Sequence, residues 1–224
     1  MLLNCRGVTV KYNNIVAVEN VDFQINKGEF VTILGQNGSG KTSLIKAILG
    51  ILPLSEGEVE WEKGIKRSYI GQNIEIKSDF PAKVREVIAS GNILKNGFLF
   101  SSKERQLVFE SAEKLGITDI LDKSFKELSG GQRQRVLIAR AIVGNPDILF
   151  FDEPVNNLDE NVRKDFYDIL KELKANGKSI VVITHDFEKI KDLCDKVLVL
   201  DKKILFFNTV AKYFKFLEKP ELQS

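Results

Sequence analysis

The sequence predicts an α/β fold: a mostly parallel sheet with an N-terminal antiparallel β-subdomain and an inserted helical subdomain. Residues 8–10 and 21–25 alternate apolar and polar side chains, which is typical of half-buried antiparallel strands. Residues 148–151 and 179–184 are short apolar runs of the kind found in strands covered on both faces of a parallel sheet. Between about residues 75 and 127, helical spacing replaces the strand pattern and indicates the inserted helices.

The first strand pattern ends near Tyr12, just before the loop Asn13–Asn14. An exposed tyrosine ring at this position could stack against a flat heterocycle. The alternative is a tyrosine that packs on the edge of the sheet. The local pattern does not separate these two interpretations.

Residues 35–42, Gly-Gln-Asn-Gly-Ser-Gly-Lys-Thr, lie between the apolar run 30–34 and a helix-like segment that begins at Ser43. In this order of strand, glycine-rich loop and helix, backbone N–H groups converge on phosphate oxygens. We therefore predict a P-loop NTPase core, in which Lys41 reaches the β- and γ-phosphates and the Thr42 hydroxyl ligates Mg²⁺. The predicted binding residues are Gly35, Asn37, Gly38, Ser39, Gly40, Lys41, Thr42 and Ser43.

Two more strands are predicted at residues 58–61 and 67–70, and the second is followed by Gly71 and Gln72. A polar side chain that leaves the end of such a strand lies where α/β sheets bind ligands. The helices of the inserted subdomain come next, and Ser101 and Ser102 are candidate N-caps for one of them.

Residues 128–132, Leu-Ser-Gly-Gly-Gln, open another predicted helix that runs to Ile142. A serine hydroxyl and exposed backbone N–H groups at a helix start can form a second anion site, separate from the P-loop. In isolation a plain N-cap is the more common interpretation, because serine before a helix caps its N-terminus.

The buried strands 148–151 and 179–184 both end in polar residues. Asp152 and Glu153 follow the first strand: Asp152 can hold Mg²⁺ through its water shell, and Glu153 can polarise the water that attacks the γ-phosphate. His185, the only histidine, follows the second strand. Because ligands bind at the carboxyl ends of parallel strands, we expect a functional role for His185.

Length and composition predict a single domain over residues 1–224, with the helical lobe at about 75–130. The net charge is +2 with 29% charged residues, so bulk charge gives no reason to expect nucleic acid as a partner.

No apolar run approaches the roughly 18 residues that a spanning helix needs. The N-terminus lacks the pattern of a secretory signal, so we expect the cytoplasm. Cys5 and Cys194 lack metal-ligand spacing and are expected to be buried, reduced thiols.

Together these motifs resemble the ATPase subunit of an ATP-binding cassette (ABC) transporter over nearly the whole chain. The resemblance rests on residues 35–42, Gln72, residues 128–132, Asp152–Glu153 and His185, in this order. It implies an ATPase that uses ATP and Mg²⁺. It also implies that ATP binding closes a dimer, that hydrolysis reopens it, and that the motion drives transport.

The same resemblance implies roles for single residues. Tyr12 would stack on adenine, Glu153 would be the catalytic base, and His185 would hold the γ-phosphate. Gln72 would contact Mg²⁺ and the attacking water and link the site to a membrane partner. Asp152 would be a metal ligand together with Thr42.

The implied homodimer is head to tail. Ser129, Gly130 and Gly131 of one subunit, with Gln132 of the same motif, would close on the γ-phosphate held by the P-loop of the other. Asp159 would communicate across the dimer. The implied partners beyond ATP and the second copy are separately encoded membrane permease subunits and, indirectly, an extracytoplasmic solute-binding protein. The chain would then be peripheral on the inner face of the cell membrane.

Residues 79–88 and 197–207 are similar to those of importer ATPases for zinc, manganese and iron chelates, which implies a transition metal or metal chelate as cargo. The alternatives are an importer ATPase for another small solute and a soluble, non-transport ABC ATPase. The near-neutral charge speaks against nucleic acid. We also expect the chain to dock on the permease through the groove between Gln72 and the helical lobe. Charged residues at Val84 or Phe98 are then expected to uncouple transport while sparing basal ATPase activity.

Overall fold

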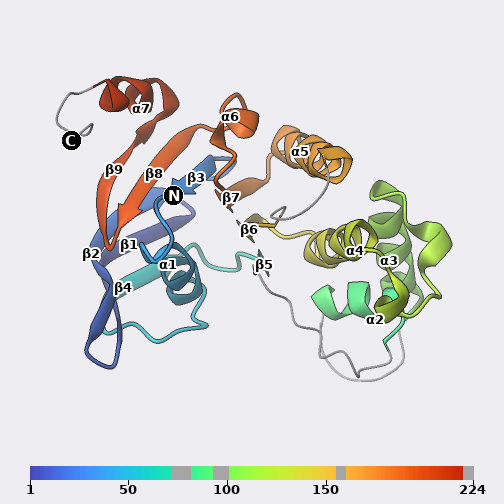
Figure 1. Ribbon diagram of the computed structural model, residues 1–224. Helices are drawn as coiled ribbons and strands as arrows, with labels where there is room; N and C mark the ends of the chain where they lie inside the picture. Colours follow the sequence, from blue (N-terminus) through green and yellow to red (C-terminus); the bar gives the residue numbers. More distant parts are fainter. Residues whose placement is uncertain (72–81, 93–100, 155–159, 219–224) are drawn as a thin grey trace.

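The computed structural model describes residues 1–71, 82–92, 101–154 and 160–218 and contains two sheets (Figure 1). The smaller sheet is antiparallel, with the strand order β2-β1-β4. The larger sheet has the order β5-β6-β7-β3-β8-β9 and is parallel except for β9. The strands are β1 (Leu3–Tyr12), β2 (Ile15–Ile25), β3 (Phe30–Leu34), β4 (Glu56–Trp61), β5 (Arg67–Ile70), β6 (Ile148–Asp152), β7 (Ser179–Ile183), β8 (Lys196–Asp201) and β9 (Lys203–Thr209). The predicted fold class is confirmed.

The helices separate into groups along the molecule. Helices α2, α3 and α4 gather at one end, to the right in Figure 1, and the antiparallel sheet lies at the other end. Helix α1 packs beside the antiparallel sheet, and α7 carries the C-terminal end. The bounds are α1 (Lys41–Ile48), α2 (Val84–Ala89), α3 (Ser102–Lys114), α4 (Gly130–Ile142), α5 (Glu160–Ala175), α6 (Phe187–Ile190) and α7 (Val210–Leu217).

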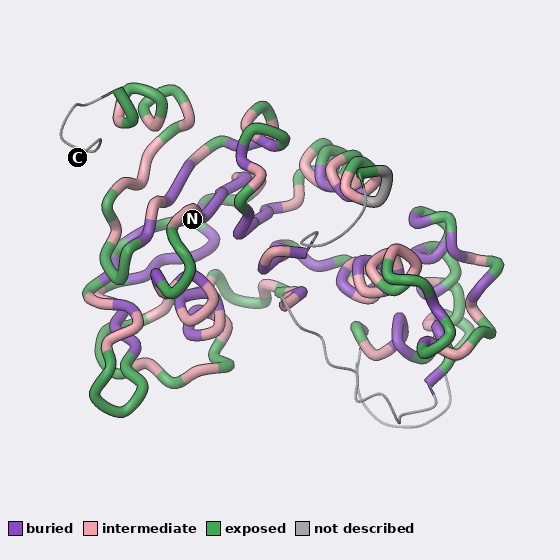
Figure 2. The backbone as a smooth tube through the Cα atoms, viewed as in Figure 1, coloured by how far each residue is buried: buried purple, intermediate pink, exposed green. Residues whose placement is uncertain are grey.

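The parallel sheet is the centre of the core, and its strands β3, β6 and β7 are buried almost throughout (Figure 2). Every residue of β6 and β7 is buried, as expected for strands covered on both faces. Alternate side chains of β3 enter different clusters. Val31 and Ile33 pack with α1 and the antiparallel sheet, whereas Phe30 packs with the helices of the opposite face.

Local sequence explains where α3 begins. The Ser101 hydroxyl accepts a hydrogen bond from the backbone N–H of Glu104, and the Glu104 carboxylate accepts one from the N–H of Ser101. Of the two candidates, Ser101 is therefore the N-cap of α3, and Ser102 is the first residue of the helix. Cys5 and Cys194 are both buried and free, also as expected, and burial raises the pKa of the Cys5 thiol to about 12. No helix of the described ranges is long and apolar enough to cross a bilayer.

Candidate active site

The loop between β3 and α1 requires glycine at two close approaches. A Cβ atom on Gly40, which has φ +98°, would lie 2.2 Å from the carbonyl oxygen of Ala17. A Cβ atom on Gly35, with φ +153°, would lie 2.2 Å from the carbonyl oxygen of Leu200. The loop is therefore pressed against β2 on one side and β8 on the other, in a backbone conformation that favours glycine.

Lys41, the first residue of α1, is only 6% exposed. Its ammonium group donates hydrogen bonds to the carbonyl oxygens of Gly35 and Gln36, both at 2.8 Å. Burial lowers the pKa of Lys41, and the carboxylates of Glu153 and Asp152 act in the opposite direction. The loop thus holds a cation in place beside two acidic side chains.

A hollow of about 420 Å³ opens in front of this loop. Its described lining residues are Tyr12, Ala17, Asn37, Gly38, Gly40, Lys41, Thr42, Ser43 and Glu153. Tyr12 is 45% exposed, and its hydroxyl lies 3.2 Å from the Ser43 hydroxyl. The exposed ring of Tyr12 thus lies at the border of the hollow, next to the start of α1.

Asp152 ends β6 and is 1% exposed. Its Oδ2 atom accepts a hydrogen bond from the Tyr69 hydroxyl at 3.1 Å, whereas Oδ1 is buried without a hydrogen-bond partner in the described ranges. Burial raises the pKa of Asp152, against the lowering effect of the nearby Thr42 and Tyr69 hydroxyls. A buried carboxylate oxygen with free acceptor capacity beside a threonine hydroxyl suits a hard cation such as Mg²⁺. The residues present therefore fit the metal that the P-loop implies.

Glu153 follows in a strained conformation, with φ +49°. Its backbone N–H donates to the carbonyl of Ile183 at 3.1 Å, and its side chain is only 8% exposed. The Oε1 atom lies 3.0 Å from Nε2 of His185, the residue that follows β7 by two positions. Because β6 and β7 are neighbours, the structure brings these two predicted residues together.

The segment before α4 lies elsewhere. The Ser129 hydroxyl accepts from the backbone N–H of Gln132 at 3.3 Å, and the Gln132 side chain accepts from the N–H of Ser129 at 3.2 Å. Ser129 and Gly130 are exposed, and neither they, Gly131 nor Gln132 lines the hollow of their own chain. Within one chain this segment forms an N-cap, and its predicted anion site is not joined to the P-loop.

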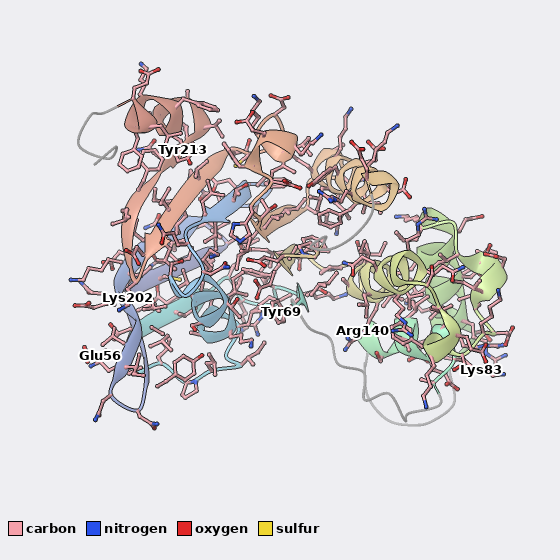
Figure 3. The ribbon with its side chains drawn as sticks, viewed as in Figure 1. Glu56, Tyr69, Lys83, Arg140, Lys202 and Tyr213 are labelled. Carbon is pink, nitrogen blue, oxygen red and sulfur yellow. The ribbon has the colours of Figure 1, made fainter. Side chains whose placement is uncertain are left out.

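Two predicted site residues, Gln72 and Asp159, lie outside the described residues, as does Phe98. Sequence reasoning missed Tyr69, which lies on β5 (Figure 3). Its hydroxyl donates a hydrogen bond to Asp152. An aromatic residue inside a strand is usually a packing residue, so the pattern gave no signal for this contact.

The expectation for Val84 was wrong. This side chain is 0% exposed in the core formed by α2, α3 and α4, so it does not belong to a surface on which another protein could dock. We now expect Val84→Asp to lower the free energy of unfolding by about 3 kcal/mol, because it buries a carboxylate without a partner. Thermal or urea unfolding measures this, with the neighbouring exposed site substituted as Lys83→Asp for comparison. A variant as stable as the Lys83 control would contradict the burial of Val84.

Comparisons with known proteins agree with this geometry. The family described as ABC transporter matches residues 18–156. The zinc uptake system ATP-binding protein ZurA of Listeria innocua is 32% identical over 234 residues, which cover 99% of this chain and 91% of that protein. The manganese transport system ATP-binding protein MntB of Listeria monocytogenes is 35% identical over 222 residues, with 95% and 92% covered.

Solved structures give the same result. The ATP-binding cassette MJ1267 in its ADP conformation superimposes with a TM-score of 0.83 at 26% identity, covering 98% of this chain and 96% of that chain. The dimeric bacterial ABC transporter cassette MJ0796 gives 0.79 at 26% identity, covering 93% and 99%. Motifs, fold and relatives thus agree, and the chain belongs to the ABC transporter family as an ATP-binding ATPase subunit.

Proposed function

We propose that this chain binds MgATP in the hollow beside the P-loop and hydrolyses it to drive import of a transition metal ion or metal chelate. One observation carries the chemical part: the carboxylates of Asp152, at the end of β6, and Glu153, directly after it, are both largely buried and act on Lys41, and Glu153 lines the hollow. The metal part is supported by relatives whose names describe zinc and manganese transport.

The proposed binding mode follows the shape of the hollow. The adenine ring stacks on Tyr12 at one side, and the triphosphate lies along the loop from Gly35 to Thr42, where Ser43 extends the binding surface. Backbone N–H groups of the loop and the Lys41 ammonium offset the phosphate charge. Lys41 is already fixed on the loop by two carbonyl groups, so little side-chain ordering remains when ATP binds.

Mg²⁺ would be held by Thr42 and Asp152, with Gln72 as a further contact. When bound, it offsets the charge of the β- and γ-phosphate oxygens. Glu153 accepts a proton from the water that attacks the γ-phosphorus, and the bond to the β–γ bridging oxygen breaks, which releases ADP and phosphate. His185, placed 3.0 Å from Glu153, contacts the γ-phosphate.

We further propose that two copies assemble head to tail. Ser129, Gly130, Gly131 and Gln132 of one copy close on the nucleotide of the other, and Asp159 joins the interface. The exposure of Ser129 and Gly130 at the positive end of α4 supports this role, since that end is open to an anion from outside the chain.

In the transporter, the chain would act at the inner face of the cell membrane on separately encoded permease subunits. A solute-binding protein outside the cell would deliver the cargo. The metal need not touch this chain: the single histidine faces Glu153, and both cysteines are buried. Metal selectivity would then reside in the other components. An importer ATPase for a different small solute is the second candidate.

Uptake measurements separate these candidates. We expect metal-starved cells that lack the gene to lose most uptake of one of the radioactive ions of zinc, manganese and iron. Restoring the wild-type gene should restore that uptake, whereas a Glu153→Gln copy should not. If all three rates are unchanged and uptake of a sugar, peptide or amino acid falls instead, the metal assignment is wrong and the ATPase assignment stands.

A further inference from the structure

The short segment that carries His185 is held locally by Thr184, the first residue after β7. The Thr184 hydroxyl accepts a hydrogen bond from the backbone N–H of Asp186 at 2.9 Å. The imidazole itself is half exposed and has Glu153 as its contact. A half-exposed ring on a loop needs further restraint if it is to meet a phosphate in one orientation.

Asp186 supplies a second anchor. It occupies the N-cap position of α6, but its side chain makes no cap hydrogen bond. Instead its Oδ2 atom accepts hydrogen bonds from the Tyr167 hydroxyl at 3.2 Å and from the Arg163 guanidinium at 3.4 Å. An aspartate at this position commonly caps its own helix, so its turn toward α5 is a specific feature of this fold.

Helix α5, which carries Arg163 and Tyr167, is packed against the core. Arg163 and Tyr167 are four residues apart and so share one face of the helix. The next residue inward, Phe166, is buried and packs edge-to-face on Phe151 with the ring centroids 5.3 Å apart. Phe151 directly precedes Asp152, the last residue of β6, and Glu153 follows. The anchor of the His185 segment and the strand of Glu153 therefore rest on the same helix.

The contact of Asp186 with Tyr167 and Arg163 is ordered and also accessible to water. A hollow of about 600 Å³ adjoins it, lined by Glu160, Arg163, Lys164, Tyr167, Asp168, Asp186 and Lys189. Burial and the Asp186 carboxylate raise the pKa of Tyr167 to about 12, so Tyr167 is a hydrogen-bond donor at neutral pH.

We propose that Asp186 is a positioning residue for ATP hydrolysis: through Tyr167 and Arg163 it ties the His185 segment to α5 and so fixes the imidazole relative to Glu153. The inference rests on the proposed role of His185 at the γ-phosphate. Asp186 itself lies outside the hollow that receives the nucleotide. Its loss should therefore affect the chemical step more than ATP binding.

Steady-state kinetics with MgATP test this. We expect Asp186→Ala to lower kcat about tenfold with KM for ATP within about twofold of wild type, because a small misplacement of a reacting group costs rate rather than affinity. Tyr167→Phe, which removes one donor and keeps the ring, should lower kcat about threefold. The matched control is Asp168→Ala, a carboxylate of the same hollow without a contact to Asp186, and it should keep the wild-type kcat.

The single histidine allows a direct structural readout. In tag-free protein the imidazole Cε1–H resonance of His185 is the only signal of its kind, since the chain has one histidine. We expect one narrow signal in wild type and in Asp168→Ala, and a broadened or split signal in Asp186→Ala and Tyr167→Phe.

An unchanged signal, or a kcat of Asp186→Ala within twofold of wild type, would overturn the proposal. If Asp186→Ala does not fold, Tyr167→Phe decides by the same two measurements. His185→Ala separates this inference from the proposed function. Normal turnover in that variant would refute the role of His185, whereas low turnover in it with a fully active Asp186→Ala would refute the positioning role alone.

Discussion

We expect Lys41→Ala to weaken ATP binding and to lower kcat/KM for ATP hydrolysis by about 10³-fold, to the limit of detection. Lys41 is the buried cation of the hollow, and its ammonium is held on the loop by the carbonyl groups of Gly35 and Gln36. Removing it leaves the β- and γ-phosphate charge without this partner. Titration with a fluorescent ATP analogue measures the loss of binding, and a phosphate-release assay measures the loss of turnover.

The matched control for this experiment is Lys178→Ala. Lys178 is another lysine whose pKa is lowered by burial, but its ammonium donates to the Asn145 side chain, away from the P-loop. The control should keep ATP binding and turnover. Wild-type activity in Lys41→Ala would refute the assignment of residues 35–42 as the phosphate-binding loop.

Glu153→Gln is expected to keep ATP binding and to lower hydrolysis by about 10²- to 10³-fold. The amide has the shape of the carboxylate, and glutamine can adopt the same backbone conformation, but it cannot accept a proton from water. ATP should therefore persist between two copies and stabilise the dimer. Size-exclusion chromatography with MgATP measures the dimer directly.

ADP serves as the control ligand for that measurement, because it lacks the γ-phosphate that the second copy would contact. We expect Glu153→Gln to elute as a dimer with MgATP and as a monomer with ADP. A variant that binds ATP yet stays monomeric at high protein concentration argues against the head-to-tail arrangement. A variant that hydrolyses ATP at the wild-type rate argues against Glu153 as the base.

The parts of the site that the sequence predicts well are those built from neighbours along the chain. In residues 35–42 the spacing of glycine, lysine and threonine determines the loop by itself, because the required backbone conformations and the helix start are local. The same holds for Ser129, whose reciprocal bonds with Gln132 span three residues.

Contacts that depend on strand register could not be predicted. Tyr69 pairs with Phe150 across β5 and β6, so its side chain lies on the face that also carries Asp152, two residues further along. A register shifted by one residue would turn Tyr69 to the other face. Val84 illustrates a similar difficulty, because helical spacing alone does not say whether an apolar residue meets its own domain or a partner.

The pairing of β3 has a consequence for how the chain folds during synthesis. This strand ends at Leu34, immediately before the P-loop, but its two neighbours in the sheet are β7 and β8, which begin at Ser179 and Lys196. The ribosome must therefore extrude most of the chain before the strand that leads to the phosphate loop gains either partner. Until then its unpaired backbone groups and its apolar side chains are open to other chains, so we expect unfinished copies to be the species most prone to aggregation.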